Sequence, residues 1–323
     1  MMTSKKPRLL ITRQVFDEVL DYLSAFFELE TNQSDEIWSR QTLLERVRDK
    51  DALYVVASDK VDDELLTAAP GLRIVATGSV GYNHVDVAAC AARGIPVTNT
   101  PDVLTEATAD MAWSLLMATA RRITESERWL REGHWQRWAW DQFLGQDLHG
   151  STLGIIGMGR IGSAVARRAR GFDMKVLYSN RSVAPNEAEI GATRVEKDEL
   201  LRQADHVVLV LPYSPQTHHL IGAAQFELMK PTATLINIAR GGIVDDAALV
   251  QALRAGKLAA AGLDVFENEP ALNPGLLEVP NVVLTPHIGS ATRSSRLGMA
   301  MLAARNLVAW VEGKPLATQV FAG

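Results

Sequence analysis

The sequence predicts an α/β protein with two doubly wound parallel sheets. Short apolar runs alternate with longer helix-like segments along the chain, and several of the runs are rich in valine and isoleucine. They lack the apolar–polar alternation of half-exposed strands, so they are typical of parallel strands that are buried on both faces. A strand–helix–strand order that repeats along a chain indicates a doubly wound architecture.

The predicted strands are the apolar runs themselves, each of about strand length. In chain order they are Leu9–Thr12, Leu53–Ala57, Leu72–Thr77, Ile95–Thr98, Thr152–Ile156, Lys175–Tyr178, His206–Leu211, Ala233–Ile238, Ala259–Leu263 and Val282–Thr285. Among the intervening segments, Asp245–Arg254 begins with two acidic residues and is followed by Gly256. These are the start and stop signals of a capped helix.

Two long helical patterns, Val103–Arg122 and Thr292–Trp310, are expected to connect the two domains. Each follows a loop that contains proline, Asn99–Asp102 before the first and Thr285–Gly289 before the second. We therefore predict one domain made of residues 1–101 plus 288–323, and a second domain made of residues 102–287.

Composition excludes several classes of protein. Of the 323 residues, 47% are hydrophobic and 22% are charged, which is normal for a folded globular chain and excludes disorder as the main state. The 33 basic and 38 acidic residues give a net charge of −5, so the chain lacks the basic character of proteins that bind nucleic acid or anionic membranes. We expect neither partner.

The cysteine count and the apolar runs indicate the compartment. Cys90 is the single cysteine, which excludes an intramolecular disulfide and a cysteine-rich zinc site and favours a reducing compartment. No motif has the spacing of a metal site, so no metal is expected. The apolar run Leu9–Ile11 is too short for a signal peptide, and no run approaches the ~18 apolar residues of a membrane span. We expect a cytoplasmic protein.

A glycine-rich loop indicates a dinucleotide-binding domain of the Rossmann type. Gly157, Gly159 and Gly162 form a G-x-G-x-x-G motif between a predicted strand and a helix-like segment, which is the context that gives this motif its meaning. The first glycine permits a tight turn, the second lets the backbone approach a pyrophosphate, and the third lets helix and strand pack closely. The start of the following helix supplies amides and a positive dipole end for phosphates.

The residues after the second strand of this domain favour NADP over NAD. A fingerprint that prefers NAD has an acid about 20 residues further on, which binds the ribose 2′-hydroxyl. Here Asn180, Arg181 and Ser182 occupy that place, with Asn180 18 residues after Gly162. A guanidinium binds a phosphate through two parallel hydrogen bonds. We therefore predict that NADP(H) is preferred and that NAD(H) remains possible; the alternative is that Arg181 is a solvated turn residue.

Five motifs in this order resemble the D-isomer-specific 2-hydroxyacid dehydrogenases, and within them most resemble the glyoxylate/hydroxypyruvate reductases. They are Ser79–Asp86, Gly157–Gly162, Asn237–Gly242, Gly262–Pro270 and Thr285–Ser290. The resemblance covers nearly the whole chain and is weakest in residues 1–50. It implies a flavodoxin-like substrate domain, a Rossmann-type cofactor domain and a cleft between them.

The resemblance also assigns roles to individual residues. Arg240 would bind the substrate carboxylate and carbonyl, His287 would be the catalytic acid with Glu269 as its partner, and the backbone amides of Val80 and Gly81 would bind the carboxylate. Glu267 is a rival to Glu269 for the histidine. Asp264 would hold the nicotinamide carboxamide. The full set of expected cofactor residues is Thr108, Gly157, Gly159, Arg160, Ile161, Gly162, Asn180, Arg181, Ser182, Leu211, Pro212, Thr217, Ile238, Arg240, Asp264, His287 and Gly289.

The chemistry of these side chains suits the reduction of a 2-keto acid. Arg240 carries a permanent charge and several donors, so it can anchor a carboxylate and polarise a carbonyl. A histidine can supply the proton near neutral pH, and a neighbouring carboxylate favours its protonated form. The expected enzyme therefore reduces glyoxylate, hydroxypyruvate or a similar small 2-keto acid with NADPH, acting in reverse on CH–OH donors.

Two alternatives remain on the same fold. One is an NAD-dependent dehydrogenase of another small acid, and the other is a nucleotide-sensing corepressor that acts by binding partners.

A tryptophan cluster bears on the oligomeric state, because Trp129, Trp135, Trp138 and Trp140 lie within twelve residues. They form either a core cluster or an interface, where tryptophan is enriched. The resemblance favours the interface of a homodimer.

Overall fold

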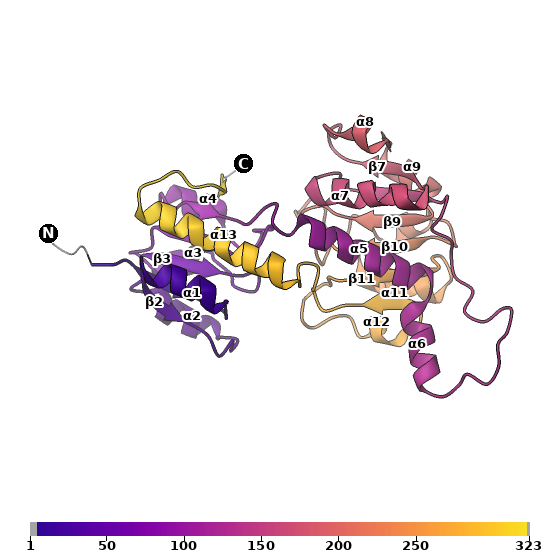
Figure 1. The fold of residues 1–323 in the computed structure, drawn as a ribbon, viewed down its shortest axis with the longest axis horizontal. Coiled ribbons are helices and arrows are strands. Elements are labelled where there is room, and N and C mark those ends of the chain that lie inside the picture. The colour runs from indigo at the N-terminus through magenta and orange to yellow at the C-terminus, as the bar shows by residue number, and fades with distance from the viewer. Residues whose placement is uncertain (1–4, 322–323) are drawn as a thin grey trace. The chain divides into compact units, whose positions relative to one another are not determined.

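The computed structural model describes residues 5–321, and the chain divides into two compact units (Figure 1). Unit 1 comprises residues 1–104 and 292–323, and unit 2 comprises residues 105–291. The boundaries thus fall three and four residues beyond the predicted ones, at the starts of the two long helices α5 (Thr105–Ala120) and α13 (Arg293–Val311).

Unit 1 contains a six-stranded sheet in the order β13-β5-β4-β3-β1-β2. The strands are β1 (Arg8–Ile11), β2 (Glu28–Thr31), β3 (Ala52–Val55), β4 (Ile74–Thr77), β5 (Val97–Thr98) and β13 (Gln319–Val320). All neighbouring pairs are parallel except β13 with β5. The parallel strands follow the order 2-1-3-4-5, which is that of flavodoxin-like folds.

Helices cover both faces of this sheet because successive strand residues point to opposite sides. Leu9 and Ile11 of β1 pack with α1 (Asp17–Ser24) and α13, whereas Leu10 packs with α2 (Arg40–Val47), α3 (Asp63–Ala68) and α4 (Val87–Ala92). The lone thiol, Cys90, is fully buried in this second layer.

Unit 2 contains a seven-stranded, all-parallel sheet in the order β12-β11-β10-β9-β6-β7-β8. The strands are β6 (Thr152–Ile156), β7 (Lys175–Ser179), β8 (Ala192–Arg194), β9 (His206–Leu209), β10 (Thr234–Asn237), β11 (Ala260–Leu263) and β12 (Val282–Leu284). Counted within the unit, this is the Rossmann order 3-2-1-4-5-6 with one further strand beside the sixth. Both sheets confirm the predicted doubly wound α/β class.

The helices of unit 2 also form two layers. In Figure 1, α5 and α7 (Arg160–Ala169) cross the near face of the sheet, and the Trp113 indole donates a hydrogen bond to the Val165 carbonyl at 3.0 Å between them. The other face is covered by α9 (Lys197–Gln203), α10 (Ala223–Phe226), α11 (Asp246–Arg254) and α12 (Gly275–Glu278). The remaining helices are α6 (Ile123–Arg131), α8 (Glu187–Ile190) and a 3₁₀ turn, Arg170–Phe172.

Three strands were not predicted from the sequence, and each lies at or near the edge of its sheet. The strand β2 carries two glutamates and is mostly half-exposed, β8 has three residues, and β13 has two. Edge strands bury little apolar surface, so they lack the continuous apolar run that identified the central strands. Within residues 5–321, no helix is long and apolar enough to cross a membrane.

Candidate active site

The expected cofactor and catalytic residues of unit 2 follow the carboxyl ends of the strands of one parallel sheet. All carboxyl ends of such a sheet meet at the same edge, which is where ligands bind in this architecture. In strand order, the residues are Gly157–Gly162 after β6, Asn180–Ser182 after β7, Leu211, Pro212 and Thr217 after β9, Ile238 and Arg240 after β10, Asp264 and Glu269 after β11, and His287 and Gly289 after β12. Thr108 lies on α5, close to Gly289: a Cβ added to Gly289 would lie 3.6 Å from the Cγ2 atom of Thr108. Val80 and Gly81 lie in unit 1, after β4.

The glycine loop has the shape that a pyrophosphate needs. Gly157 has φ 103°, and a Cβ there would lie 2.3 Å from the Val210 carbonyl oxygen. A Cβ on Gly162 would lie 2.2 Å from the Gly157 carbonyl oxygen, whereas one on Gly159 would meet nothing within 4 Å. Gly159 is the N-cap of α7, so the open space beside it lies at the start of this helix, where backbone amides and the positive end of the helix dipole favour a phosphate. These residues therefore fit a dinucleotide.

The loop after β7 carries the residues expected at the adenosine ribose. Arg181 and Ser182 are exposed, and Asn180 is half-buried. The guanidinium of Arg194 donates to the Asn180 carbonyl through Nε at 3.1 Å and Nη2 at 3.0 Å. The sequence did not reveal Arg194 because its contact with the loop depends on the pairing of β7 with the short edge strand β8.

Thr217 fixes the shape of the loop after β9. Its hydroxyl accepts from the Ser214 amide at 2.7 Å and donates to the Pro212 carbonyl at 3.0 Å. The side chain that resemblance assigns to the cofactor therefore also closes the turn that presents Pro212.

His287 and Glu269 are hydrogen-bonded partners. The Nδ1 atom of His287 lies 2.7 Å from Oε2 of Glu269, and the Phe266 amide donates to Oε1 of Glu269 at 2.8 Å. Burial raises the pKa of Glu269, but the hydrogen bonds from His287 and Phe266 and the positive charges of His287 and Arg240 outweigh it, so this pKa lies below its usual value. Glu269 is therefore a carboxylate near neutral pH. Because a carboxylate only accepts, Nδ1 donates the proton of this bond and Nε2 remains for a ligand.

Asp264 shapes the loop that presents His287. Its buried carboxylate accepts from the Thr285 hydroxyl at 2.7 Å, the Ile288 amide at 2.8 Å and the Gly289 amide at 2.7 Å. Within this loop, His287 has a left-handed backbone with φ 52°, and its amide donates to the Asp264 carbonyl at 2.9 Å. A left-handed histidine is uncommon and persists where its surroundings hold it. The supporting role of Thr285 was not predicted from the sequence.

Arg240 lies on a turn that packs directly against the segment carrying Glu269. The Asn237 side chain closes this turn by accepting from the Ala239 amide at 3.0 Å and donating to the Arg240 carbonyl at 3.2 Å. A Cβ on Gly241 would lie 1.7 Å from the Phe266 carbonyl oxygen, so only glycine permits this backbone contact. Burial lowers the pKa of Arg240 and the charge of Glu269 opposes that shift; the guanidinium stays positive because its usual pKa is far above neutral.

Glu267, the rival partner for His287, belongs to a different cluster. Its Oε1 atom lies 2.7 Å from Nε2 of His219, and its amide donates to the Asp246 carboxylate at 3.1 Å. Among the described residues, His218, His219 and Glu267 place potential metal-ligand atoms within 4.8 Å of one another. The hydrogen bonds of His219 to Glu267 and of His218 to Tyr213 account for this grouping.

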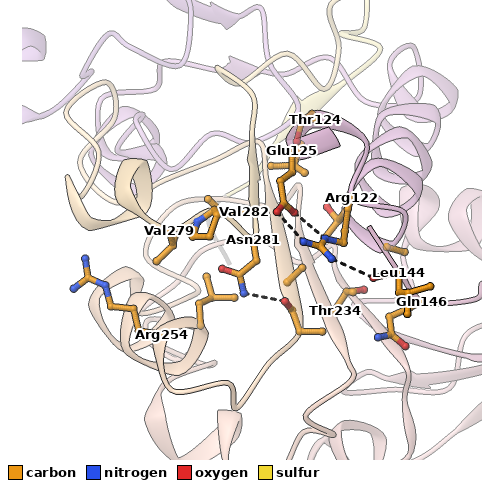
Figure 2. A pocket seen from close by; sticks show the side chains of 18 residues that line it. Arg122, Thr124, Glu125, Leu144, Gln146, Thr234, Arg254, Val279, Asn281 and Val282 are labelled. Atoms are coloured by element: carbon orange, nitrogen blue, oxygen red, sulfur yellow. Dashed lines mark hydrogen bonds and ion pairs between the residues drawn. The ribbon is translucent and has the colours of Figure 1, made fainter. Parts of the chain in front are cut away.

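A cavity of about 480 Å³ in unit 2 lies at the opposite edge of the same sheet (Figure 2). Thr234, Ala260 and Val282 line it, and these residues begin β10, β11 and β12. The catalytic candidates follow the carboxyl ends of those strands. This cavity is therefore separate from the candidate active site.

The fold and the site define an NAD(P)-dependent oxidoreductase, and the comparisons with known proteins agree. The family model described as "D-isomer specific 2-hydroxyacid dehydrogenase, NAD binding domain" matches residues 113–289. The chain belongs to the D-isomer specific 2-hydroxyacid dehydrogenases, enzymes that act on CH–OH donors.

The chain is similar to curated glyoxylate reductases over nearly its whole length. It is 51% identical to the glyoxylate reductase of Thermococcus onnurineus (strain NA1), over 96% of this chain and 94% of the relative. Among solved structures, an NADPH-dependent glyoxylate/hydroxypyruvate reductase from Sinorhizobium meliloti, in complex with NADP and malonate, is 38% identical with a TM-score of 0.87. That match covers 98% of this chain and 97% of the other. A D-lactate dehydrogenase from Aquifex aeolicus, complexed with NAD and lactic acid, is 29% identical with a TM-score of 0.86, over 98% of this chain and 99% of the other.

Proposed function

We propose that this enzyme reduces glyoxylate, hydroxypyruvate or a similar small 2-keto acid to the D-2-hydroxy acid, with NADPH as the preferred cofactor. The observation that carries the proposal is the 2.7 Å hydrogen bond between His287 and Glu269, beside Arg240 and at the same sheet edge as the glycine loop. The names of the relatives support the choice of substrate.

The catalytic side chains have distinct tasks. Arg240 binds the substrate carboxylate and polarises the carbonyl oxygen through its guanidinium donors. His287 gives a proton from Nε2 to that oxygen, and Glu269 fixes the ring and stabilises its charge through Nδ1. The backbone amides of Val80 and Gly81 also bind the carboxylate. In the reverse reaction, neutral His287 accepts the proton at Nε2.

The cofactor is held by the sheet-edge residues. The amides of Arg160, Ile161 and Gly162 bind the pyrophosphate at the start of α7, and Asp264 binds the nicotinamide carboxamide. Thr108, Leu211, Pro212, Thr217, Ile238 and Gly289 line the remainder of the dinucleotide site. When bound, NADPH supplies the hydride for the reduction.

The preference for NADPH is tested by changing Arg181 to alanine. A guanidinium bonded to a phosphate contributes as a charged hydrogen bond, so its loss lowers kcat/KM for NADPH by about tenfold or more and leaves NADH nearly unchanged. Arg202→Ala is the control, because Arg202 is an exposed arginine in the last turn of α9 and lies toward the amino edge of the sheet. If the ratio of the two efficiencies stayed the same in Arg181→Ala, Arg181 would have no role in cofactor choice.

The substrate is tested with purified enzyme, NADPH and a panel of 2-keto acids. The panel comprises glyoxylate, hydroxypyruvate, 2-ketogluconate and phenylpyruvate, which share the carboxylate and carbonyl that Arg240 would bind. The proposal expects the highest kcat/KM for glyoxylate or hydroxypyruvate. A preference for either larger acid would contradict the substrate assignment, and no turnover of any acid would favour a binding protein.

We also propose that the enzyme is a homodimer. The loop after α6 projects from unit 2 in Figure 1 and exposes Trp135, Trp138 and Trp140, with 58%, 65% and 86% of their surfaces accessible. Large exposed aromatic side chains are costly in water and are enriched at interfaces. Sedimentation should show a dimer that the double change Trp138→Ser and Trp140→Ser weakens; a wild-type monomer would contradict this.

A further inference from the structure

Arg194 lies at the carboxyl end of β8, the edge strand of the unit 2 sheet. The parallel register pairs Arg194 with Tyr178, close to the end of β7. The chain leaves β7 through the segment that contains Asn180, Arg181 and Ser182. The strand pairing therefore places Arg194 beside the loop that is expected to read the adenosine ribose.

The guanidinium of Arg194 binds this loop through two successive carbonyls. Nε and Nη2 donate to the Asn180 carbonyl at 3.1 Å and 3.0 Å, and Nη2 also donates to the Arg181 carbonyl at 3.3 Å. Both carbonyls are thereby held toward the edge strand. A fork of donors from a planar group restricts the loop more than a single hydrogen bond would.

The same contact adds a second permanently charged arginine to this loop. Arg194 bonds to the carbonyls of Asn180 and Arg181, and the side chains of Arg181 and Arg194 are both exposed. An anion that lies beside this loop is attracted by both charges. A phosphate monoester carries roughly −1.5 to −2 charges at neutral pH and accepts several hydrogen bonds, so it suits such a pair.

We propose that Arg194 is a positioning and specificity residue for a 2′-phosphate on the cofactor's adenosine. It holds the Asn180–Ser182 loop in the shape that directs Arg181 to the phosphate, and it adds a second positive charge. This inference rests on the proposed preference for NADPH and extends it to a residue on another strand. Arg194 acts through the loop and is not a catalytic residue.

The test compares two adenosine nucleotides that differ in the 2′-phosphate. Isothermal titration calorimetry measures the binding of adenosine 2′,5′-bisphosphate and of 5′-AMP to the full chain, in the wild type and in Arg194→Gln, Arg194→Lys and Arg202→Gln. Glutamine keeps a donor but loses the charge and the fork, lysine keeps the charge alone, and Arg202→Gln removes an exposed charge from α9.

The wild type is expected to bind the bisphosphate more tightly than 5′-AMP. Arg194→Gln should reduce that ratio by about fivefold or more, a loss at the low end of the range for charged hydrogen bonds because the side chain is exposed. The ratio for Arg194→Lys should lie between those of Arg194→Gln and the wild type, and the ratio for Arg202→Gln should equal that of the wild type. In turnover, Arg194→Gln should raise KM for NADPH while kcat and the KM for NADH stay near wild type.

The possible failures are distinct. If the wild type discriminates between the two nucleotides and Arg194→Gln retains the full ratio, the inference about Arg194 is wrong while the preference for NADPH stands. Equal weakening of both nucleotides would show that Arg194 only maintains the structure, which also overturns the inference. If the wild type binds both nucleotides equally, the proposed cofactor preference fails first, and the role of Arg194 fails with it.

Discussion

Changing Asp264 to asparagine should destabilise unit 2 and slow catalysis together. The carboxylate is 1% exposed and accepts three hydrogen bonds, from Thr285, Ile288 and Gly289, at 2.7 to 2.8 Å. Asparagine keeps one acceptor oxygen and replaces the other with an NH₂ group, which would face a backbone amide. At least one charged hydrogen bond is lost, worth ~1.5–3 kcal/mol, and a buried donor is left unpaired. We expect the free energy of unfolding to fall by about 2–4 kcal/mol.

The catalytic effect follows from the position of His287 in the same loop. A misplacement of reacting groups by about 1 Å can cost roughly 100-fold in rate, so kcat of Asp264→Asn should fall by at least that factor. Urea unfolding followed by tryptophan fluorescence and single-turnover reduction measure the two effects. Thr285→Ser, which retains the hydroxyl donor, is the matched control and should change little. An Asp264→Asn variant with wild-type stability and rate would refute this account of the loop.

Two further predictions concern acidic residues of unit 2. Glu269→Gln keeps an acceptor oxygen for Nδ1 of His287 but removes the carboxylate charge, so kcat for reduction should fall by about tenfold or more while NADPH affinity stays near wild type; a wild-type kcat with saturating NADPH would exclude this role. Burial, with the charges of Glu267 and Asp245, raises the pKa of the Asp246 carboxyl from 3.8 to about 6. The folded state therefore binds the carboxyl proton more tightly than the unfolded state, and the contribution of Asp246 to stability falls as pH rises from 3.8 to about 6. Asp246→Asn should gain stability relative to wild type between about pH 4 and pH 7, by up to ~3 kcal/mol at 1.36 kcal/mol per pKa unit; a difference in urea midpoint between variant and wild type that is the same at about pH 4 and about pH 7 would contradict this.

The central strands could be predicted from the sequence because burial on both faces leaves a continuous apolar run. Thr152–Ile156 was predicted with the bounds that β6 has, and the helix at Asp246–Arg254 is capped by Asp245 as expected. The edge strands β2, β8 and β13 were missed because exposure removes that signal. Because β8 was not predicted, the contact of Arg194 with the loop after β7 could not be predicted either.

The site could be predicted as a set of motifs but not as a set of contacts. The pairing of Glu269 rather than Glu267 with His287 depends on the turn between Phe266 and Glu269, where one acid faces His287 and the other faces His219. No spacing rule distinguishes these acids. The contribution of Thr285 depends likewise on a hydrogen bond across two strand ends.

The central claim is that His287, held by Glu269, delivers the proton that completes the reduction. The most direct test is the single-turnover rate of glyoxylate reduction by His287→Ala, with NADPH saturating and NADPH binding measured in parallel. The account predicts a rate lower by ~10²–10⁴-fold, the usual loss when a general acid is removed, with nearly unchanged NADPH affinity because the phosphates bind at the glycine loop. It also predicts that lowering the pH restores none of this rate. Turnover close to that of the wild type would contradict the mechanism.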